Sequence, residues 1–432
     1  MSIFLWKEII NLRIHETEWV KSIISLIKKP ANPKKKLKSL AWITYLCKNM
    51  YVSGQHLVGE GAIPVILECL DLNDVQIFEL AIKTIGIILK NDQSCMDQVE
   101  KTTVLEKLVI VLQAKKDDII IQQTEINKSL QESCAWCISI LLEGITLPNR
   151  KRMKSAIPVL LKLIKPKYEE KSTSNHWLWA LFYITEEFMQ KEVSKKEIIE
   201  KFKKGTIDDI MECSISILKG DIKTLHRPAL KILANLLSSE VITPECVLKS
   251  EVLDSLKTML ESKQSEIIRN DWLKILSHIC KGDYDWVLKI VHLELYLPMV
   301  RYFQYNGSNI QLIAALCLKN LTNKVSYNMA ESLIHCNIFG ILLDILRGFD
   351  DSELQNHVAS IICNIISFIM DTDNPNHSLI DKILEHSDPD FLDMIEEHEI
   401  PVKGNEKTPY LKTMSVLKEI IQMRMLELEE DE

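Results

Sequence analysis

A repeat of about 42 residues is the feature that most constrains the fold of this 432-residue chain. A phrase of small residues followed by an apolar helix occurs at Gly61–Leu67 and again at Ser155–Leu161, with weaker copies later. After each copy comes a second helical stretch whose apolar residues fall at i, i+3, i+4 and i+7, as in residues 230–237. Such a unit cannot bury its own apolar face, so it must stack on neighbouring copies.

Alignment of these second helices gives separations of 42, 53, 43, 52, 43, 42 and 44 residues between equivalent positions: Ala41, Lys83, Trp136, Trp179, Lys231, Lys274, Leu316 and Ser360. A helical period near 42 is typical of an armadillo or HEAT solenoid, whereas a generic helical bundle would not keep a period over seven intervals. The two long intervals indicate insertions at Lys115–Lys128 and Lys191–Lys204, which we expect to loop out of the stack.

Composition supports helices and excludes several classes of function. The chain has only 12 Gly and 13 Pro, too few for a turn-rich β-sandwich. Its net charge of −8 argues against a general nucleic-acid-binding protein, which would carry an excess of positive charge. No apolar run reaches the ~20 residues that span a bilayer, so we predict no membrane segment, and the first residues predict no signal peptide. The 11 cysteines are expected to be reduced and buried.

Several phrases of the sequence resemble importin-α, the adaptor that binds nuclear localisation signals. They are Gly59–Pro64, Ala81–Gly86, Cys134–Ser139, Trp179–Tyr183 and Pro228–Asn235. The resemblance implies an all-α fold, an armadillo-repeat right-handed superhelical solenoid. It also implies an N-terminal cap and partial first repeat (residues 1–38), armadillo repeats (39–370), and an irregular last repeat with an acidic C-terminal tail (371–432).

The resemblance also implies a peptide-binding groove. In importin-α the groove helices carry Trp and, four residues later, Asn, and residues i and i+4 share one helical face. The Asn amide holds the backbone of an extended peptide, and the Trp rings form slots for Lys and Arg stems. The residues of this chain that would bind the peptide are Trp136, Trp179, Tyr183, Asn235, His278, Asn320 and Asn364.

Other positions depart from the importin-α pattern. Ile87 and Ile140 stand where an amide is expected, and Asn91 stands where the family has the acid of its deep lysine slot. A charge-assisted hydrogen bond contributes ~1.5–3 kcal/mol, so its loss should weaken binding of a conventional signal roughly tenfold to a hundredfold.

The expected partners follow from the same comparison. They are basic peptide segments of cargo proteins and, through the acidic stretch Glu427–Glu432, the export receptor that recycles importin-α. The sequence does not support recruitment of importin-β, because no Arg- and Lys-rich arm precedes the first repeat. We interpret the basic cluster of residues 28–38 as a solvated loop between helices. The resemblance implies a protein of the cytoplasm and nucleus, without nucleic-acid or membrane partners.

No catalytic, metal or cofactor site is predicted. Cys134 and Cys137 have the spacing of half a zinc site, but a second pair is missing, and thiols at i and i+3 of a helix favour a core position. We find no phosphate-binding loop, nucleophile elbow or kinase signature. Two functions therefore remain: an importin-α-like adaptor for basic peptides in nuclear import, or an armadillo scaffold that has lost transport and docks a folded partner. An enzyme is not expected.

Overall fold

The computed structural model describes residues 16–28, 33–49, 52–71, 74–100, 102–113, 124–144, 157–164, 171–189, 194–250, 252–261, 266–303, 308–324, 326–348, 352–370 and 379–381. Every regular element in these ranges is a helix, which confirms the predicted all-α class. The predicted irregular last repeat and acidic tail lie outside the described residues, apart from 379–381. The chain divides into two compact units, residues 1–241 and 242–432, and each is described by itself.

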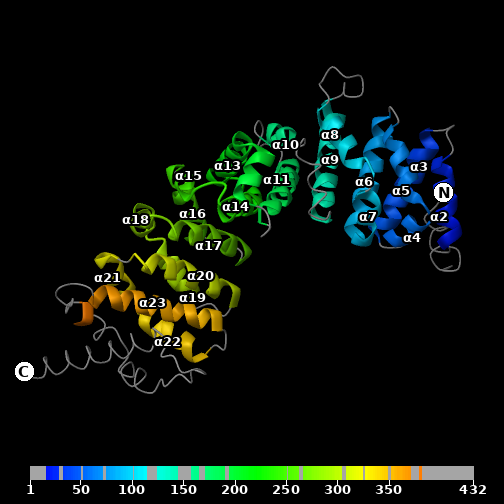
Figure 1. Ribbon diagram of the computed structural model, residues 1–432. Helices are drawn as coiled ribbons and strands as arrows, with labels where there is room; N and C mark the ends of the chain where they lie inside the picture. Colours follow the sequence, from blue (N-terminus) through cyan, green and yellow to red (C-terminus); the bar gives the residue numbers. More distant parts are fainter. Residues whose placement is uncertain are drawn as a thin grey trace, which may run out of the picture. The chain divides into compact units, whose positions relative to one another are not determined.

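Among the described residues, the first unit contains the helix pair α2 and α3, followed by repeats of two or three helices (Figure 1). Its helices are α2 (Glu16–Lys28), α3 (Pro33–Lys48), α4 (Gly54–Gly59), α5 (Ala62–Glu68), α6 (Val75–Asn91), α7 (Met96–Glu100), α8 (Val104–Gln113), α9 (Thr124–Gly144), α10 (Ile157–Ile164), α11 (Lys171–Thr185), α12 (Lys195–Phe202), α13 (Lys204–Lys219) and α14 (Lys223–Ser238). The predicted boundary between residues 38 and 39 falls inside α3.

The described part of the second unit contains three successive three-helix repeats. Its helices are α15 (Pro244–Lys249), α16 (Val252–Glu261), α17 (Glu266–Cys280), α18 (Tyr284–His292), α19 (Tyr296–Phe303), α20 (Ser308–Thr322), α21 (Tyr327–His335), α22 (Ile338–Gly348) and α23 (Ser352–Met370). Three helices per repeat, the first of them short, identify armadillo rather than HEAT repeats. None of the helices in the described part of the chain is long and apolar enough to cross a lipid bilayer.

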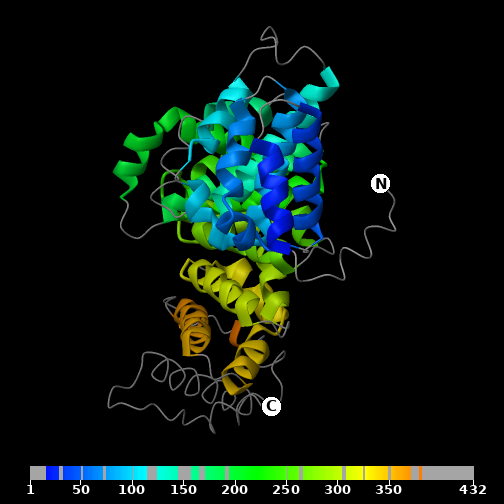
Figure 2. The same cartoon turned by 90° about the vertical axis from the view of Figure 1, so that its right-hand side faces the viewer.

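Within each unit, the last helix of a repeat packs against the last helix of the next repeat, and we call these the ladder helices. They run in the order α3, α6, α9, α11 and α14 in the first unit, and α17, α20 and α23 in the second. Within each unit the colours of neighbouring helices follow the sequence, as a stack of repeats requires (Figures 1 and 2). All eight positions aligned from the sequence fall on these helices, so the repeat alignment is confirmed.

Local sequence explains where several helices begin. Asp74 precedes α6 and accepts hydrogen bonds from the backbone N–H groups of Gln76 and Ile77, which have no partner inside the helix. Buried apolar side chains then recur along α6, including Ile82 and Ile85, and fill the space between repeats. Trp177 and Trp272, which lie outside the aligned positions, are 1% and 0% exposed and belong to the packed interior.

Four of the corners between the first two helices of a repeat contain a residue with positive φ. Gly61 takes this conformation in one repeat at φ 75°, which glycine adopts without steric cost. Lys203, Glu294 and Asn337 occupy the same kind of corner at φ 60°, 54° and 53°. A positive φ therefore recurs at this corner in repeats that have no glycine there, at a local energetic cost, although ψ differs between Gly61 (32°) and Lys203 (136°).

Two expectations about loops are wrong for the residues described. Lys34, Lys35, Lys36 and Lys38 lie in the first turns of α3, because Pro33 is well suited to the first position of a helix. Residues 195–202 form α12, which begins at a capping box between Ser194 and Glu197. In the other predicted insertion, residues 124–128 belong to α9, and residues 115–123 lie outside the described residues.

Candidate functional site

The residues predicted to bind a peptide fall on neighbouring ladder helices within each unit. In the first unit, Trp136 lies on α9, Trp179 and Tyr183 on α11, and Asn235 on α14. In the second unit, one residue lies on each successive ladder helix: His278 on α17, Asn320 on α20 and Asn364 on α23. All seven side chains are partly exposed. The face that carries them is called the ladder face, and it is treated separately in the two units.

Trp136 packs directly against the backbone of α6. A β-carbon built on Gly86 would lie 2.5 Å from Cζ3 of the Trp136 ring, closer than two carbon atoms can approach. Gly86 therefore creates the space in which the indole lies. Trp136 is held against the preceding repeat by its packing and keeps part of its surface exposed.

Trp179 belongs to an aromatic cluster on α11. Its ring centre lies 5.5 Å from that of Phe182 in an edge-on arrangement and 6.1 Å from that of Tyr183. The guanidinium of Arg227, on α14, lies over the Trp179 ring at 5.3 Å from its centre. Lys231 lies over the Phe182 ring at 5.2 Å. The indole that was predicted to receive a cation from a peptide is thus already contacted by a cation of the next repeat.

The three predicted asparagines donate hydrogen bonds to the preceding repeat. Asn235 Nδ2 donates to Thr185 Oγ1 at 3.1 Å, and Asn320 Nδ2 donates to the Ser277 carbonyl at 3.4 Å. Asn364 Nδ2 donates to the Lys319 carbonyl at 3.3 Å and to Thr322 Oγ1 at 3.1 Å. Because the amide donors link adjacent ladder helices, these residues stabilise the stack as well as lining its face.

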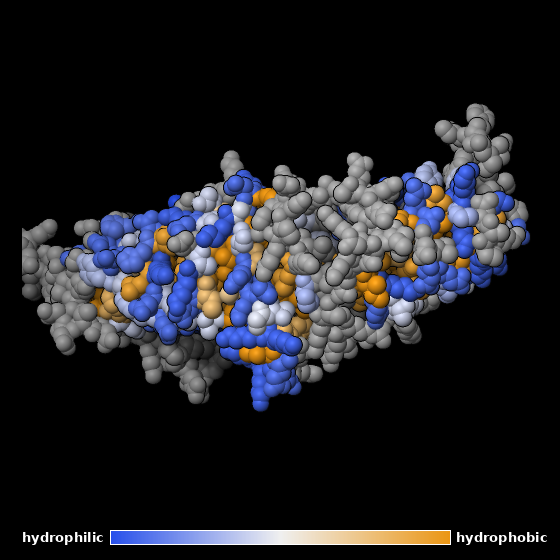
Figure 3. Space-filling model, turned by 90° about the horizontal axis from the view of Figure 1, so that it is seen from above, coloured by the Kyte–Doolittle hydropathy of each residue, from blue (hydrophilic) through white to orange (hydrophobic). Residues whose placement is uncertain are grey.

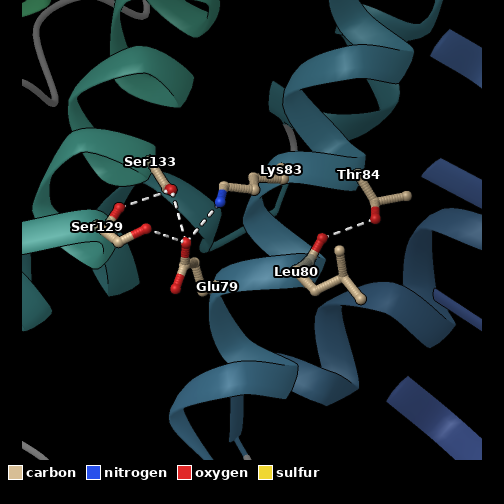
Figure 4. Close-up of polar contacts among 6 residues, drawn as sticks. All are labelled: Glu79, Leu80, Lys83, Thr84, Ser129 and Ser133. Carbon is tan, nitrogen blue, oxygen red and sulfur yellow. Dashed lines mark hydrogen bonds and ion pairs between the residues drawn. The ribbon is translucent and has the colours of Figure 1, made fainter. Parts of the chain in front are cut away.

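A polar cluster replaces the tryptophan expected on α6 (Figure 4). Lys83 Nζ lies 2.5 Å from Glu79 Oε1, one turn earlier on the same helix. Ser129 and Ser133 of α9 donate to the same carboxylate oxygen at 2.6 and 3.4 Å. Burial opposes ionisation of Glu79, but these hydrogen bonds and the positive charge of Lys83 outweigh it and hold the pKa of Glu79 below its ordinary value. The cluster joins α6 to α9.

Asn91, which aligns with the acid of the deep lysine slot of importin-α, and its neighbour Asp92 are both used in local structure. Asn91 Nδ2 donates to the Cys47 carbonyl at 2.6 Å. Asp92 accepts from the Gln55 backbone N–H at 2.9 Å and from the Ser94 hydroxyl at 2.5 Å. The hydrogen bond from Ser94 is the main reason that the pKa of Asp92 is lowered. A β-carbon on Gly54 would lie 2.7 Å from the Asp92 β-carbon, so these two residues are in close contact.

Charged groups of both signs accompany Trp136 and Trp179. Glu132 and Glu143 lie four residues before and seven residues after Trp136, on the same face of α9. Burial lowers the pKa of His176 on α11, while the charge of Glu132 acts in the opposite direction. These carboxylates give the α9 part of the ladder face an acidic character, and Arg227 and Lys231 give the α14 part a basic one.

Exposed apolar side chains are dispersed over the surface. In the coloured parts of Figure 3, hydrophobic residues lie interspersed with hydrophilic ones on the face in view. The large apolar residues with the highest exposure come from six different elements: Leu26, Tyr45, Ile110, Met189, Tyr284 and Tyr327. The candidate site is therefore defined by aromatic rings, amides and charges rather than by an apolar patch.

The expected burial holds for eight of the 11 cysteines, whereas Cys246, Cys336 and Cys363 are partly exposed. Cys134 and Cys137 are both fully buried in α9, as predicted for core residues. Burial raises the pKa of Cys47, Cys137 and Cys280 to about 12, so these thiols are poor nucleophiles. Among the described residues, no three His, Cys, Asp or Glu side chains gather as a metal site requires.

Sequence reasoning missed Arg227 and the roles of Gly86 and Glu79. A signal for Arg227 was present, because it lies one helical turn before Lys231 and therefore on the same face. Gly86 belongs to the phrase Ala81–Gly86, but nothing in that phrase shows that an indole 50 residues later will pack on it. Glu79 and Lys83 form an i, i+4 pair that the sequence does display.

Comparison with known proteins gives distant relatives. Importin subunit alpha-1a of rice (Oryza sativa subsp. japonica) is 21% identical over 261 residues, 60% of this chain and 45% of the relative. Importin subunit alpha-3 of Arabidopsis thaliana is 19% identical over 253 residues, 58% of this chain and 43% of the relative. The matched region thus covers less than half the length of these curated relatives. No protein-family model matches the chain.

The fold has a clear counterpart among solved structures. The crystal structure of an engineered protein from the Northeast Structural Genomics Consortium superposes with a TM-score of 0.64, at 16% identity, over 93% of this chain and 98% of its own. At this identity the likeness concerns the fold alone. Together with the three-helix repeats and the relatives above, these findings show that the chain is an armadillo-repeat solenoid with distant sequence similarity to importin-α.

Proposed function

We propose that this chain is an importin-α-like adaptor that binds an extended peptide across the ladder face of α9, α11 and α14. The observation that carries the proposal is the placement of Trp136, Trp179 and Asn235 on three successive ladder helices of the first unit. Aromatic rings offer flat surfaces to Lys and Arg stems. The Asn235 amide oxygen has no hydrogen-bond partner in the part of the chain that the structure describes, so it can accept one from a peptide backbone.

The charges indicate where basic residues of a peptide would lie. Glu132 and Glu143 accompany Trp136, so a Lys or Arg there would meet both a ring and a carboxylate. On α6 the corresponding position is Lys83, which is already paired with Glu79. We therefore place the basic part of the ligand at α9 and propose basic segments of nuclear-localisation type as the ligand class. Nuclear protein import, with a location in cytoplasm and nucleus, is the cellular role that follows.

A titration with a short labelled basic peptide tests the proposal. We expect weak binding, with a Kd of about 10 μM or higher, or about −7 kcal/mol. Trp179→Ala should weaken binding by ~1–2 kcal/mol because it removes a stacking surface. Tyr284→Ala, which removes an exposed aromatic side chain from α18, is the matched control. Asn320→Ala reports on the second unit and should have little effect. Loss of binding on Asn320→Ala with an unchanged Trp179→Ala would move the site to the second unit.

Import activity requires a further partner beyond the peptide. In a second experiment, purified importin-β and the purified export receptor are each mixed with the chain and the labelled peptide. Formation of a ternary complex with importin-β would support the import adaptor. Peptide binding without such a complex would reduce the proposal to a peptide-binding module, and binding of the export receptor would support a recycling step.

The alternative function is an armadillo scaffold that docks a folded protein, and one observation favours it. Asn235, Asn320 and Asn364 donate to the preceding repeats, and Lys83 is held by Glu79, so several predicted binding groups already serve the stack. If no basic peptide binds to the wild-type chain, this alternative replaces the adaptor.

A further inference from the structure

Two cations of α14 lie against aromatic rings of α11 inside the proposed binding face. Arg227 lies over Trp179 and Lys231 over Phe182, at 5.3 and 5.2 Å from the ring centres. The two cations are four residues apart, so they occupy the same face of α14. A basic side chain of a ligand would meet charges of its own sign at this point, whereas an acidic one would meet charges of the opposite sign.

Arg227 has a hydrogen-bonding capacity that the described residues do not satisfy. Its Nε atom is buried and has no hydrogen-bond partner there, and Arg227 makes no ion pair within the same residues. Its Nη groups have no acceptor among the described residues either and, unlike Nε, they are accessible to solvent, so a ligand reaches the guanidinium at the edge that these groups form. The group that best complements such an edge is a carboxylate, which can accept two parallel hydrogen bonds.

We propose that Arg227 binds a carboxylate of the ligand, so that the peptide held by this face carries both basic and acidic residues. The inference rests on the proposed function and specifies its ligand. The basic residues lie at α9, near Glu132 and Glu143, and an Asp or Glu lies at α14. Two helix spacings of ~8–10 Å separate α9 from α14. An extended chain covers the resulting ~16–20 Å in about five or six residues, which sets the interval between the two charge groups.

The test uses labelled peptides that share one Lys- and Arg-containing segment and a spacer of five uncharged residues. One peptide ends in Asp-Glu and its partner in Asn-Gln, and both are also made with the order of the segments reversed. Fluorescence anisotropy measures binding to the full chain and to its variants Arg227→Gln and Arg227→Lys. Lys196→Gln removes one positive charge from exposed α12 and serves as the matched control. Circular dichroism verifies that each variant is folded.

We expect the wild-type chain to bind an Asp-Glu peptide at least about tenfold more tightly than its Asn-Gln partner. Arg227→Gln should remove this preference, Arg227→Lys should retain part of it, and Lys196→Gln should leave it intact. The inference is overturned if the wild type does not distinguish the two peptides while still binding both, or if the preference persists in Arg227→Gln. Failure of all four peptides to bind would instead reject the proposed function.

Discussion

The contact between Gly86 and Trp136 allows a prediction whose sign depends on a second residue. A β-carbon at position 86 would lie 2.5, 3.0 and 3.1 Å from three carbon atoms of the indole, so Gly86→Ala forces the ring to move. Overpacking of this kind costs ~1–3 kcal/mol. Alanine also favours a helix over glycine by ~1 kcal/mol, which offsets part of that cost. The expected result is a net destabilisation of ~0–2 kcal/mol.

In the background of Trp136→Ala the indole is absent, and the same substitution should reverse its effect. Gly86→Ala is then expected to stabilise the chain by ~1 kcal/mol, because only the helix preference remains. The coupling energy between the two substitutions should be ~1–3 kcal/mol. The matched control is Gly205→Ala in α13, where no neighbouring atom lies within 4 Å of the added carbon. It should raise stability by up to ~1 kcal/mol, equally in both backgrounds.

Urea unfolding, monitored by far-UV circular dichroism, measures the free energy of unfolding of the wild type and of five variants. The variants are the three single substitutions and the two that combine Trp136→Ala with Gly86→Ala or Gly205→Ala. The Trp136→Ala variant alone should be less stable than the wild type, because a partly buried ring is lost. If Gly86→Ala has the same effect with and without Trp136, the two residues do not interact as described. The described packing of Trp136 against α6 would then be wrong.

The remaining predictions concern charge, backbone and thiols. Glu79→Gln should destabilise the chain by ~1 kcal/mol at neutral pH. Because the folded pKa of Glu79 lies below its ordinary 4.5, its contribution is complete above that value and is lost as the pH falls through the folded pKa. The urea midpoints of wild type and variant should therefore converge as the pH is lowered from neutral past 4.5 to below the folded pKa. Lys203→Gly should raise the urea midpoint by the equivalent of ~1 kcal/mol because φ at this position is 60°, whereas Lys204→Gly, at the first position of α13, should lower it slightly. Native-state alkylation at pH 8, followed by mass spectrometry, should first modify the three partly exposed cysteines, Cys246, Cys336 and Cys363. Rapid labelling of the buried cysteines would contradict the described core.

The repeat was predictable because burial imposes a period on the sequence. Each ladder helix must place apolar side chains against its neighbours, so the positions equivalent to Trp136 and Trp179 could be aligned from the order of the amino acids alone. Fold and repeat boundaries follow from a pattern summed over many residues, which makes them robust to local variation.

The features that were missed depend on local or cross-repeat geometry. Residues 34–38 were expected in a loop because they are highly charged, yet Pro33 starts a helix there. Residues 195–202 were likewise expected in a loop, but the capping box at Ser194 starts α12 there. The position of Arg227 over Trp179, and the donation from Asn364 to α20, join residues of adjacent repeats. A single sequence places such residues on the correct helices but does not show which side chains meet.

The hydrogen bonds of the asparagine side chains between repeats have a consequence for the gain and loss of whole repeats in armadillo proteins. The acceptors of Asn320 and Asn364 are the carbonyls of Ser277 and Lys319, and both carbonyls lie three residues after the aligned position of their own helix. A main-chain carbonyl is present at that point whatever amino acid occupies it. A duplicated or deleted repeat would therefore still offer an acceptor to the asparagine that follows, and whole repeats can be gained or lost during evolution without leaving this interface unsatisfied.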